Sequence, residues 1–338
     1  MSEEKRRVQL DDIAAALGIS KTTVSRALSG KGRIGAETRE RVIACAKEMN
    51  YVAPAPALVT AAETNGVTHN IGVVIPMDSK GTEAPFFQTC MAGITKCCAV
   101  RGYDTLMIGA EENDISHLKR VISQRKVDGI IITRTLADGS MEKMLREAEI
   151  PFVAIGRSAD ESAVTVDSAH TEGCCELTSY LMMNNPPERI GLLLGKMDQT
   201  VNKSRLAGFE QAFTNAGLTP NADLTVTGLG SEILIQRAVS ELLRRGCGCI
   251  ICGDDVLCMQ LVTVLSSMGT AIPRDVKVAS FYGNDYLDMY SPPITSLKFG
   301  AADLGMTAAD QIMNMLDRGS AGHPTILGFE MLIRKSTM

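Results

Sequence analysis

Short apolar segments alternate with amphipathic helices from residue 70 to residue 316, and this alternation restricts the fold of the 338-residue chain more than any other feature. Ile71–Ile75 and Phe152–Ile155 are continuous apolar runs, which predict strands that are buried on both faces. Phe87–Val100 and Ile115–Gln124 have the apolar spacing of helices that cover such strands. The succession predicts an α/β fold with a doubly wound parallel sheet.

The same succession starts again near residue 163, and 338 residues are too many for one ordinary core. Two lobes are therefore expected at 70–338. We expect lobe 1 at about 70–162 and 294–325, and lobe 2 at about 163–293 and 326–338. In this scheme the strand Val164–Val166 opens lobe 2, and the strand Ile294–Leu297 and the helix Ala301–Leu316 return to lobe 1.

Three short helices are expected ahead of the lobes. Leu10–Leu17 has apolar residues at helical spacing, and Gly18 tolerates the left-handed backbone that ends a helix. Ser20 can then cap a second helix with its hydroxyl. A third amphipathic helix is predicted at about Ala36–Met49, and it would close a three-helix core. Two helices joined by a tight turn that contains glycine predict a helix-turn-helix domain at residues 1–51.

Charge is distributed unevenly along the chain, whose net charge is −5. Residues 1–50 hold ten Lys and Arg against seven Asp and Glu, which leaves 24 against 32 of the totals of 34 and 39 for the rest. A basic head on an acidic body is typical of a local phosphate-binding module. The N-terminus lacks the apolar core of a signal peptide and no apolar run is long enough to span a membrane, so a cytoplasmic protein is expected.

Short motifs along nearly the whole chain resemble the lac-repressor family of bacterial transcription regulators. In the head these are Leu10–Leu17, Ser20-x-x-Thr23-Val24-Ser25-Arg26-x-Leu28 and Glu37-Thr38-Arg39-x-Arg41-Val42. In the lobes they are Lys126-Val127-Asp128-Gly129, Ile150-Pro151-Phe152-Val153, Ser204–Phe209 and Ser291–Leu297. The resemblance implies a helix-turn-helix domain followed by a two-lobed periplasmic-binding-protein-like domain. Thr133-Arg134-Thr135 and Ile155-Gly156-Arg157 resemble the maltose- and raffinose-type subgroup.

The resemblance implies a repressor whose operator affinity is controlled by a small effector, and we expect a sugar. It also implies a homodimer, because one short helix offers few base contacts and a two-fold operator needs two heads. We predict that Arg26 contacts a guanine, that Lys21 and Thr22 set sequence preference, and that the remaining hydroxyls hold phosphates. The predicted DNA-binding residues are Ser20, Lys21, Thr22, Thr23, Ser25, Arg26 and Leu58.

A linker is expected at residues 52–69, where the family has a hinge helix whose leucine wedges into the minor groove. Tyr51 matches the family pattern, but Thr60 stands where that leucine would be. Leu58 is the candidate replacement for the wedge. Pro56 lacks a backbone donor and restricts where a hinge helix can start.

A ligand of a doubly wound sheet binds outside the carboxyl ends of the strands. That rule, together with the family resemblance, selects loops from both lobes that face one cleft. Aromatic residues there suit an apolar sugar face or a nucleobase, and arginines suit hydroxyls or a carboxylate. The predicted effector-binding residues are Phe86, Phe87, Thr133, Arg134, Arg157, Arg205, Asp254, Tyr282 and Phe299.

The sequence also bears on two other classes of function, an enzyme and a transport receptor. An enzyme is not supported, because Gly228-x-Gly230 lacks the third glycine of a dinucleotide site and the four histidines lie far apart in the chain. We expect no catalytic residue, metal or cofactor. A solute-binding receptor of a transport system would share both lobes, but it would not need the basic head. A regulator that responds to a nucleobase also remains open.

Overall fold

The computed structural model describes residues 10–29, 35–49, 66–77, 85–111, 114–319 and 322–338. They form two compact units, Met1–Gly66 and Val67–Met338. Each unit has its own apolar core. Among the described residues, no helix is long and apolar enough to cross a membrane.

The N-terminal unit is a three-helix bundle. Its helices are α1 (Leu10–Leu17), α2 (Lys21–Ser29) and α3 (Ala36–Glu48). Two buried residues from each helix make the core, namely Ile13, Ala14, Val24, Ala27, Val42 and Ala46. The small side chains let the helices approach closely, and the helical periodicity of these positions explains why the bundle was predicted from the sequence.

The turn between α1 and α2 has the expected chemistry. Gly18 has φ +64°, in the left-handed region that favours glycine. The Ser20 hydroxyl accepts a hydrogen bond from the Thr23 backbone N–H at 3.1 Å, which satisfies one orphan donor of α2. The predicted cap is confirmed, and it stabilises the first turn of α2.

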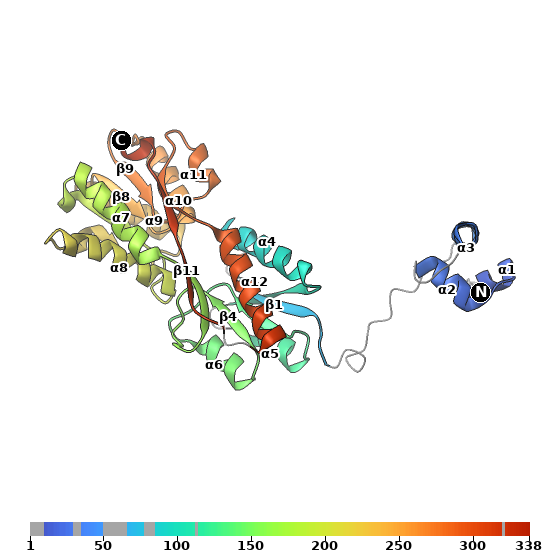
Figure 1. Ribbon diagram of the computed structural model, residues 1–338. Coiled ribbons are helices and arrows are strands. Elements are labelled where there is room, and N and C mark those ends of the chain that lie inside the picture. Colours follow the sequence, from blue (N-terminus) through green and yellow to red (C-terminus); the bar gives the residue numbers. More distant parts are fainter. Residues whose placement is uncertain (1–9, 30–34, 50–65, 78–84, 112–113, 320–321) are drawn as a thin grey trace, which may run out of the picture. The chain divides into compact units, whose positions relative to one another are not determined.

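The second unit has two six-stranded sheets, one in each lobe (Figure 1). The lobe 1 sheet is parallel throughout and has the order β11-β5-β4-β3-β1-β2. Its strands are β1 (Asn70–Pro76), β2 (Asp104–Ala110), β3 (Gly129–Ile132), β4 (Phe152–Ile155), β5 (Val164–Ser168) and β11 (Thr325–Leu327). One face carries α4 (Pro85–Val100) and α12 (Ala301–Arg318), and the other carries α5 (Ser116–Ser123) and α6 (Ser140–Glu147).

The lobe 2 sheet has the order β12-β10-β9-β8-β6-β7, and only β12 runs antiparallel to its neighbour. Its strands are β6 (Ile190–Leu193), β7 (Thr225–Val226), β8 (Cys249–Cys252), β9 (Lys277–Ser280), β10 (Thr295–Phe299) and β12 (Phe329–Leu332). The helices are α7 (His170–Asn184), α8 (Thr200–Asn215), α9 (Glu232–Arg244), α10 (Asp255–Ser267) and α11 (Asp285–Met289), with short turns of 3₁₀ helix at Pro187–Arg189, Ala222–Leu224 and Lys335–Thr337. The α7 and α8 helices cover one face, and α9 and α10 cover the other.

Two strands lie in the lobe opposite to the one expected. Val164–Ser168 pairs with Val153–Ile155 and so completes the lobe 1 sheet, although a restart of lobe 2 near residue 163 was predicted. Thr295–Phe299 pairs with β9 and β12 in lobe 2, whereas a return to lobe 1 at residue 294 was predicted. The chain therefore crosses between the lobes after β5, after β10 and between β11 and β12. Apolar patterning shows that a strand is buried but does not identify its neighbour.

Candidate functional site

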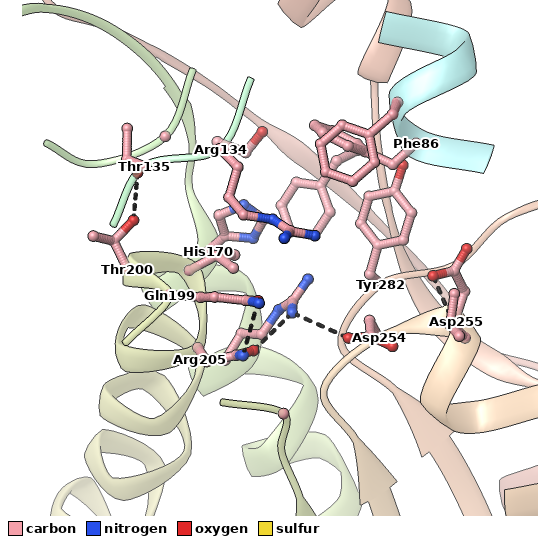
Figure 2. A pocket seen from close by; sticks show the side chains of 18 of the residues that line it. Phe86, Arg134, Thr135, His170, Gln199, Thr200, Arg205, Asp254, Asp255 and Tyr282 are labelled. Carbon is pink, nitrogen blue, oxygen red and sulfur yellow. Dashed lines mark hydrogen bonds and ion pairs between the residues drawn. The ribbon is translucent and has the colours of Figure 1, made fainter. Parts of the chain in front are cut away.

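A cavity of about 350 Å³ lies at the carboxyl ends of both sheets, where loops of the two lobes face each other (Figure 2). Parallel strands place their following loops at one edge, so the two sheets bring several helix starts to one place. The lining includes the first residues of α4, α7, α8, α10 and α12. This volume is within the range of small-molecule sites.

Eight of the nine predicted effector-binding residues line this cavity. They are Phe86, Phe87, Thr133, Arg134, Arg205, Asp254, Tyr282 and Phe299. Arg157 does not line it, because its side chain is exposed on the loop after β4. The Arg157 charge nevertheless acts on Asp167, which does line the cavity, so an effector contact by Arg157 stays a prediction.

Aromatic rings form one wall of the cavity and come from both lobes. Phe86 of lobe 1 meets Tyr282 of lobe 2 edge-on, with 5.8 Å between the ring centroids. Tyr282 and Phe299 are nearly parallel, at 6.0 Å and 5°. Such rings offer flat apolar faces to a sugar or a planar ligand. Because the wall joins the lobes, a ligand resting on it contacts both.

Arg205 of α8 is the central polar side chain of the opposite wall, and only 6% of its surface is exposed. Its Nη1 donates to Asn202 Oδ1 at 3.0 Å and lies 3.7 Å from Asp254 Oδ2. Its Nε is buried and has no hydrogen-bond partner among the described residues. A buried donor without a partner is costly, so this nitrogen indicates a position for a ligand acceptor.

Two further buried atoms at the cavity, His170 Nδ1 and Gln260 Oε1, have no hydrogen-bond partner in the part of the chain that the structure describes. Burial, followed by the Arg205 charge, lowers the pKa of His170 to about 3, so the ring is neutral at pH 7. A neutral imidazole can donate or accept, whereas the Gln260 oxygen only accepts. The cavity therefore has places for both ligand acceptors and ligand donors.

Several lining residues were not predicted from the sequence. They include Thr135, Asp167, Ser168, His170, Lys196, Gln199, Thr200, Asn202, Asp255 and Gln260. Ser168 and His170 lie at the end of β5, so the strand-end rule applies to them whichever lobe holds that strand. Gln260 lies inside α10, where no signal in the sequence distinguishes it.

Two adjacent carboxylates at the start of α10 accept hydrogen bonds from neighbouring protein groups. Asp254 caps the helix, because its Oδ1 accepts from the Leu257 backbone N–H at 2.8 Å. Asp255 accepts from the Asn284 amide and, at 2.9 Å, from the Val256 backbone N–H. Burial, and then the neighbouring Asp254 charge, raises the pKa of Asp255 to about 6.

Asp255 should make the free energy of unfolding of the two-lobed unit depend on pH. Since its folded pKa exceeds the unfolded value of about 3.9, its contribution is fully present below pH 4 and is lost as the pH rises through 6. We expect the wild-type chain to lose on the order of 3 kcal/mol relative to Asp255→Asn between these limits. Denaturant unfolding of both proteins from pH 4 to pH 8 measures the difference, and a pH-independent difference would contradict the assignment.

The lobes also contact each other beside the cavity. The Thr135 and Thr200 hydroxyls are hydrogen-bonded at 2.6 Å, and the Ala137 N–H donates to the Asp198 carbonyl at 2.9 Å. These bonds join the loop after β3 in lobe 1 to the start of α8 in lobe 2. Because α8 carries Arg205, movement of the lobes and the position of Arg205 are mechanically linked.

In the N-terminal unit, α2 presents a polar face. Lys21, Thr22, Ser25 and Arg26 are exposed on it, and Lys21 lies 2.7 Å from Asp11. Ser20 and Thr23 lie at the helix start, with their hydroxyls 2.8 Å apart. Leu58 lies outside the described residues. This exposed face has the residue types that contact phosphates and base edges.

Two family models match the chain. "Bacterial regulatory proteins, lacI family" matches residues 9–53, and "Periplasmic binding proteins and sugar binding domain of LacI family" matches residues 68–327. Among curated proteins, the HTH-type transcriptional repressor PurR of Photobacterium profundum is 26% identical over 335 residues, covering 97% of this chain and 98% of that protein. PurR of Pasteurella multocida is 25% identical, with 97% and 98% covered.

Solved structures share the fold. The lac repressor dimer bound to operator and the anti-inducer ONPF superposes with a TM-score of 0.77 at 21% identity, covering 98% of this chain and all of that chain. The transcriptional regulator CelR in complex with cellobiose gives a TM-score of 0.73 at 23% identity, with the same coverage. With a helix-turn-helix unit followed by a two-lobed body that holds a cleft, and with family models that match both parts, this chain belongs to the LacI family of bacterial regulatory proteins.

Proposed function

We propose that the chain is a sequence-specific repressor whose operator affinity is controlled by a small effector bound in the cavity. One observation supports effector control most strongly: the cavity has a buried arginine nitrogen that no described residue hydrogen-bonds, opposite an aromatic wall that joins the two lobes. A protein that only bound DNA would not need such a site. Because the operator lies on the chromosome, we place the protein in the cytoplasm.

For DNA, the proposed contacts follow from the α2 surface. Arg26 contacts a guanine in the major groove, and Lys21 and Thr22 set preference at neighbouring bases. Ser20, Thr23 and Ser25 hold phosphates, and Leu58 is the proposed minor-groove wedge. Two copies are required, because one α2 helix supplies few base contacts and a two-fold operator matches a dimer.

The coupling between the two sites has a mechanical route. An effector that binds one arrangement of the lobes better than another shifts their equilibrium. In a dimer this shift changes the separation of the two linkers, and with it the ability of both heads to reach half-sites one helical turn apart. Such coupling is typically about 1–3 kcal/mol. Effector binding can strengthen or release the operator by this route.

A sugar remains the effector that we propose, and the maltose- and raffinose-type subgroup remains a prediction. The cavity supports a sugar through flat rings on one wall and hydrogen-bonding groups on the other. The nearly parallel Tyr282 and Phe299 rings would also suit the flat face of a nucleobase.

Binding to genomic DNA fragments distinguishes a regulator from a solute-binding receptor of a transport system, because such a receptor would retain no DNA.

Arg205→Ala should abolish the effector response while operator binding without effector survives. The substitution removes the buried donor of the polar wall but leaves the N-terminal unit unchanged. We expect the coupling of about 1–3 kcal/mol to fall to zero. Operator affinity is measured by fluorescence anisotropy with and without each compound of a carbohydrate panel that stabilises the wild-type chain. Arg237→Ala, which removes an exposed arginine of α9 outside the lining, is the matched control. An unchanged response in Arg205→Ala would place the effector elsewhere.

A further inference from the structure

One side chain of lobe 1 holds the last residues of the linker predicted at 52–69. Asp128 Oδ1 accepts from the Thr68 backbone N–H at 2.8 Å and from the Thr68 hydroxyl at 2.9 Å. Asp128 Oδ2 accepts from the His69 backbone N–H at 2.8 Å. Three donors on two consecutive residues therefore converge on one carboxylate, and hydrogen bonds to an ionised acceptor are the stronger ones. We call this contact of Asp128 with Thr68 and His69 the linker anchor.

The backbone of His69 is fixed in an unusual conformation by the anchor and its surroundings. Its φ is +56°, in the left-handed region that residues other than glycine rarely adopt. The His69 carbonyl accepts from the Asp104 N–H at 2.8 Å, and the His69 ring lies 5.2 Å from the Tyr103 ring. A strained residue persists only where several contacts hold it. The chain therefore enters lobe 1 in a fixed direction.

The anchor lies where two neighbouring parallel strands begin, and the sheet does not need it. Asn70 is the first residue of β1, and Asp128 directly precedes β3. The Asp128 N–H donates to the Asn70 carbonyl at 2.9 Å, and Asn70 Nδ2 donates to the Lys126 carbonyl at 3.1 Å. These bonds join the strand ends without the Asp128 carboxylate. What the carboxylate adds is the attachment of Thr68 and His69.

β3 connects the anchor with the cavity. Its residues Gly129–Ile132 are all buried, and it pairs with β1 on one side and β4 on the other. Residues 133–135 follow it and line the cavity, and the Thr135 hydroxyl is hydrogen-bonded to Thr200 of lobe 2 (Figure 2). At the spacing of a strand, Asp128 is about 17 Å from the first of these lining residues. A buried strand that is paired on both sides moves as one rigid element, and such elements carry coupling between sites.

We propose that Asp128 is a positioning residue of the regulatory mechanism. The linker anchor makes the linker move with β3, so that a rearrangement of the lobes at the cavity reaches the DNA-binding heads. This inference rests on the proposed function, because it names the contact through which the cavity and the operator site are coupled. It also gives a role to the motif at 126–129, of which no residue lines the cavity.

Asp128→Asn tests the anchor itself. An amide of the same shape replaces one acceptor oxygen by a donor, which then faces a backbone N–H or the Thr68 hydroxyl. Hydrogen exchange of the full chain, measured by mass spectrometry, should become about tenfold faster or more at the Thr68 and His69 amides. Asp104→Asn is the matched control, because it makes the same change of charge beside His69 in a side chain that is exposed and outside the anchor.

The second measurement follows the signal from the operator to the cavity. Operator fragments recovered from genomic DNA are the probe, because coupling between two sites is reciprocal. In the wild-type chain and in Asp104→Asn, bound operator should change hydrogen exchange in the lining residues 133–135 and at the start of α8. In Asp128→Asn this change should be lost, although the heads still bind the DNA.

Two graded variants separate the anchor from general stability. Thr68→Val removes only the hydroxyl donor and should lose part of the response at the cavity. Asp128→Glu keeps a carboxylate and should retain more of the response than Asp128→Asn. Circular dichroism and thermal unfolding confirm that each variant is folded. A lower melting temperature of Asp128→Asn with a full response at the cavity would identify a purely structural role and overturn the proposal.

The wild-type chain distinguishes this inference from the proposed function. Operator binding that leaves hydrogen exchange at the cavity unchanged would overturn the role of Asp128, while the chain would still be a DNA-binding protein. Unchanged exchange at Thr68 and His69 in Asp128→Asn would also overturn it, because the anchor would then not hold these residues. If the wild-type chain retains no genomic fragment, the proposed function fails, and the inference that rests on it fails too.

Discussion

Replacing Arg26 with alanine is expected to lower the affinity of the dimer for its operator by about 2–6 kcal/mol, or roughly 30-fold to 20,000-fold. Each bidentate contact between an arginine and a guanine contributes about 1–3 kcal/mol of discrimination, and a two-fold operator contains two such contacts. Arg26 lies on the exposed face of α2, away from the buried Val24 and Ala27. The loss should therefore come from base recognition and not from unfolding of the bundle.

The measurement is operator affinity across a set of sequences with single base changes. In Arg26→Ala the preference should disappear at one symmetric pair of positions and persist at the others. Arg41→Ala, which removes an exposed charge from α3, is the matched control and should leave base preference unchanged. Equal weakening of all sequences by Arg26→Ala would show that Arg26 holds a phosphate.

Replacing Gly305 with alanine is expected to destabilise lobe 1 by about 1–3 kcal/mol, even after the gain of helix propensity. A Cβ at Gly305 of α12 would lie 2.2 Å from the Cys90 carbonyl oxygen of α4. One at Gly93 of α4 would lie 2.2 Å from the Ala302 carbonyl oxygen of α12. The two helices therefore approach backbone to backbone at two glycines, and they lie side by side in Figure 1. Alanine forces them apart, because neither carbonyl can rotate away.

Thermal unfolding measures this effect, at about 2–4 °C for each kcal/mol. Gly328→Ala is the control, because a Cβ there would meet nothing within 4 Å and the backbone is not left-handed. Gly93→Ala with Gly305→Ala should cost less than the sum of the single changes, since the separation of α4 and α12 that one alanine forces also makes room for the other. A melting temperature of Gly305→Ala at or above that of Gly328→Ala would contradict this description. Effector binding should weaken too, because α4 and α12 both begin at the cavity.

Local chemistry explains why the N-terminal bundle could be predicted in detail. Its helices are defined by side-chain periodicity, by Gly18 and by the Ser20 cap, all of which act within a few residues. The alternation of strands and helices likewise predicted two doubly wound lobes. Assignment of Val164–Ser168 and Thr295–Phe299 to a lobe failed, because it depends on pairing with strands far along the chain.

The same distinction applies to the cavity. The strand-end rule and the family resemblance selected eight lining residues, since both concern backbone topology. They could not separate Arg205, which turns inward and is buried, from Arg157, which is exposed. His170 also follows a strand, but nothing in the sequence shows that its ring lines the cavity. The direction of a side chain depends on tertiary packing, which periodicity does not encode.

Operator affinity measured with and without a compound that stabilises the wild-type chain tests most directly whether the cavity controls DNA binding. Operator fragments are first recovered from genomic DNA, and compounds are chosen because they raise the melting temperature of the wild-type chain but not that of Arg205→Ala. A change in affinity of about 5-fold to 150-fold is predicted for the wild-type chain, with the same factor for the effect of operator on compound binding. A compound that requires Arg205 for binding yet leaves operator affinity unchanged would contradict the account.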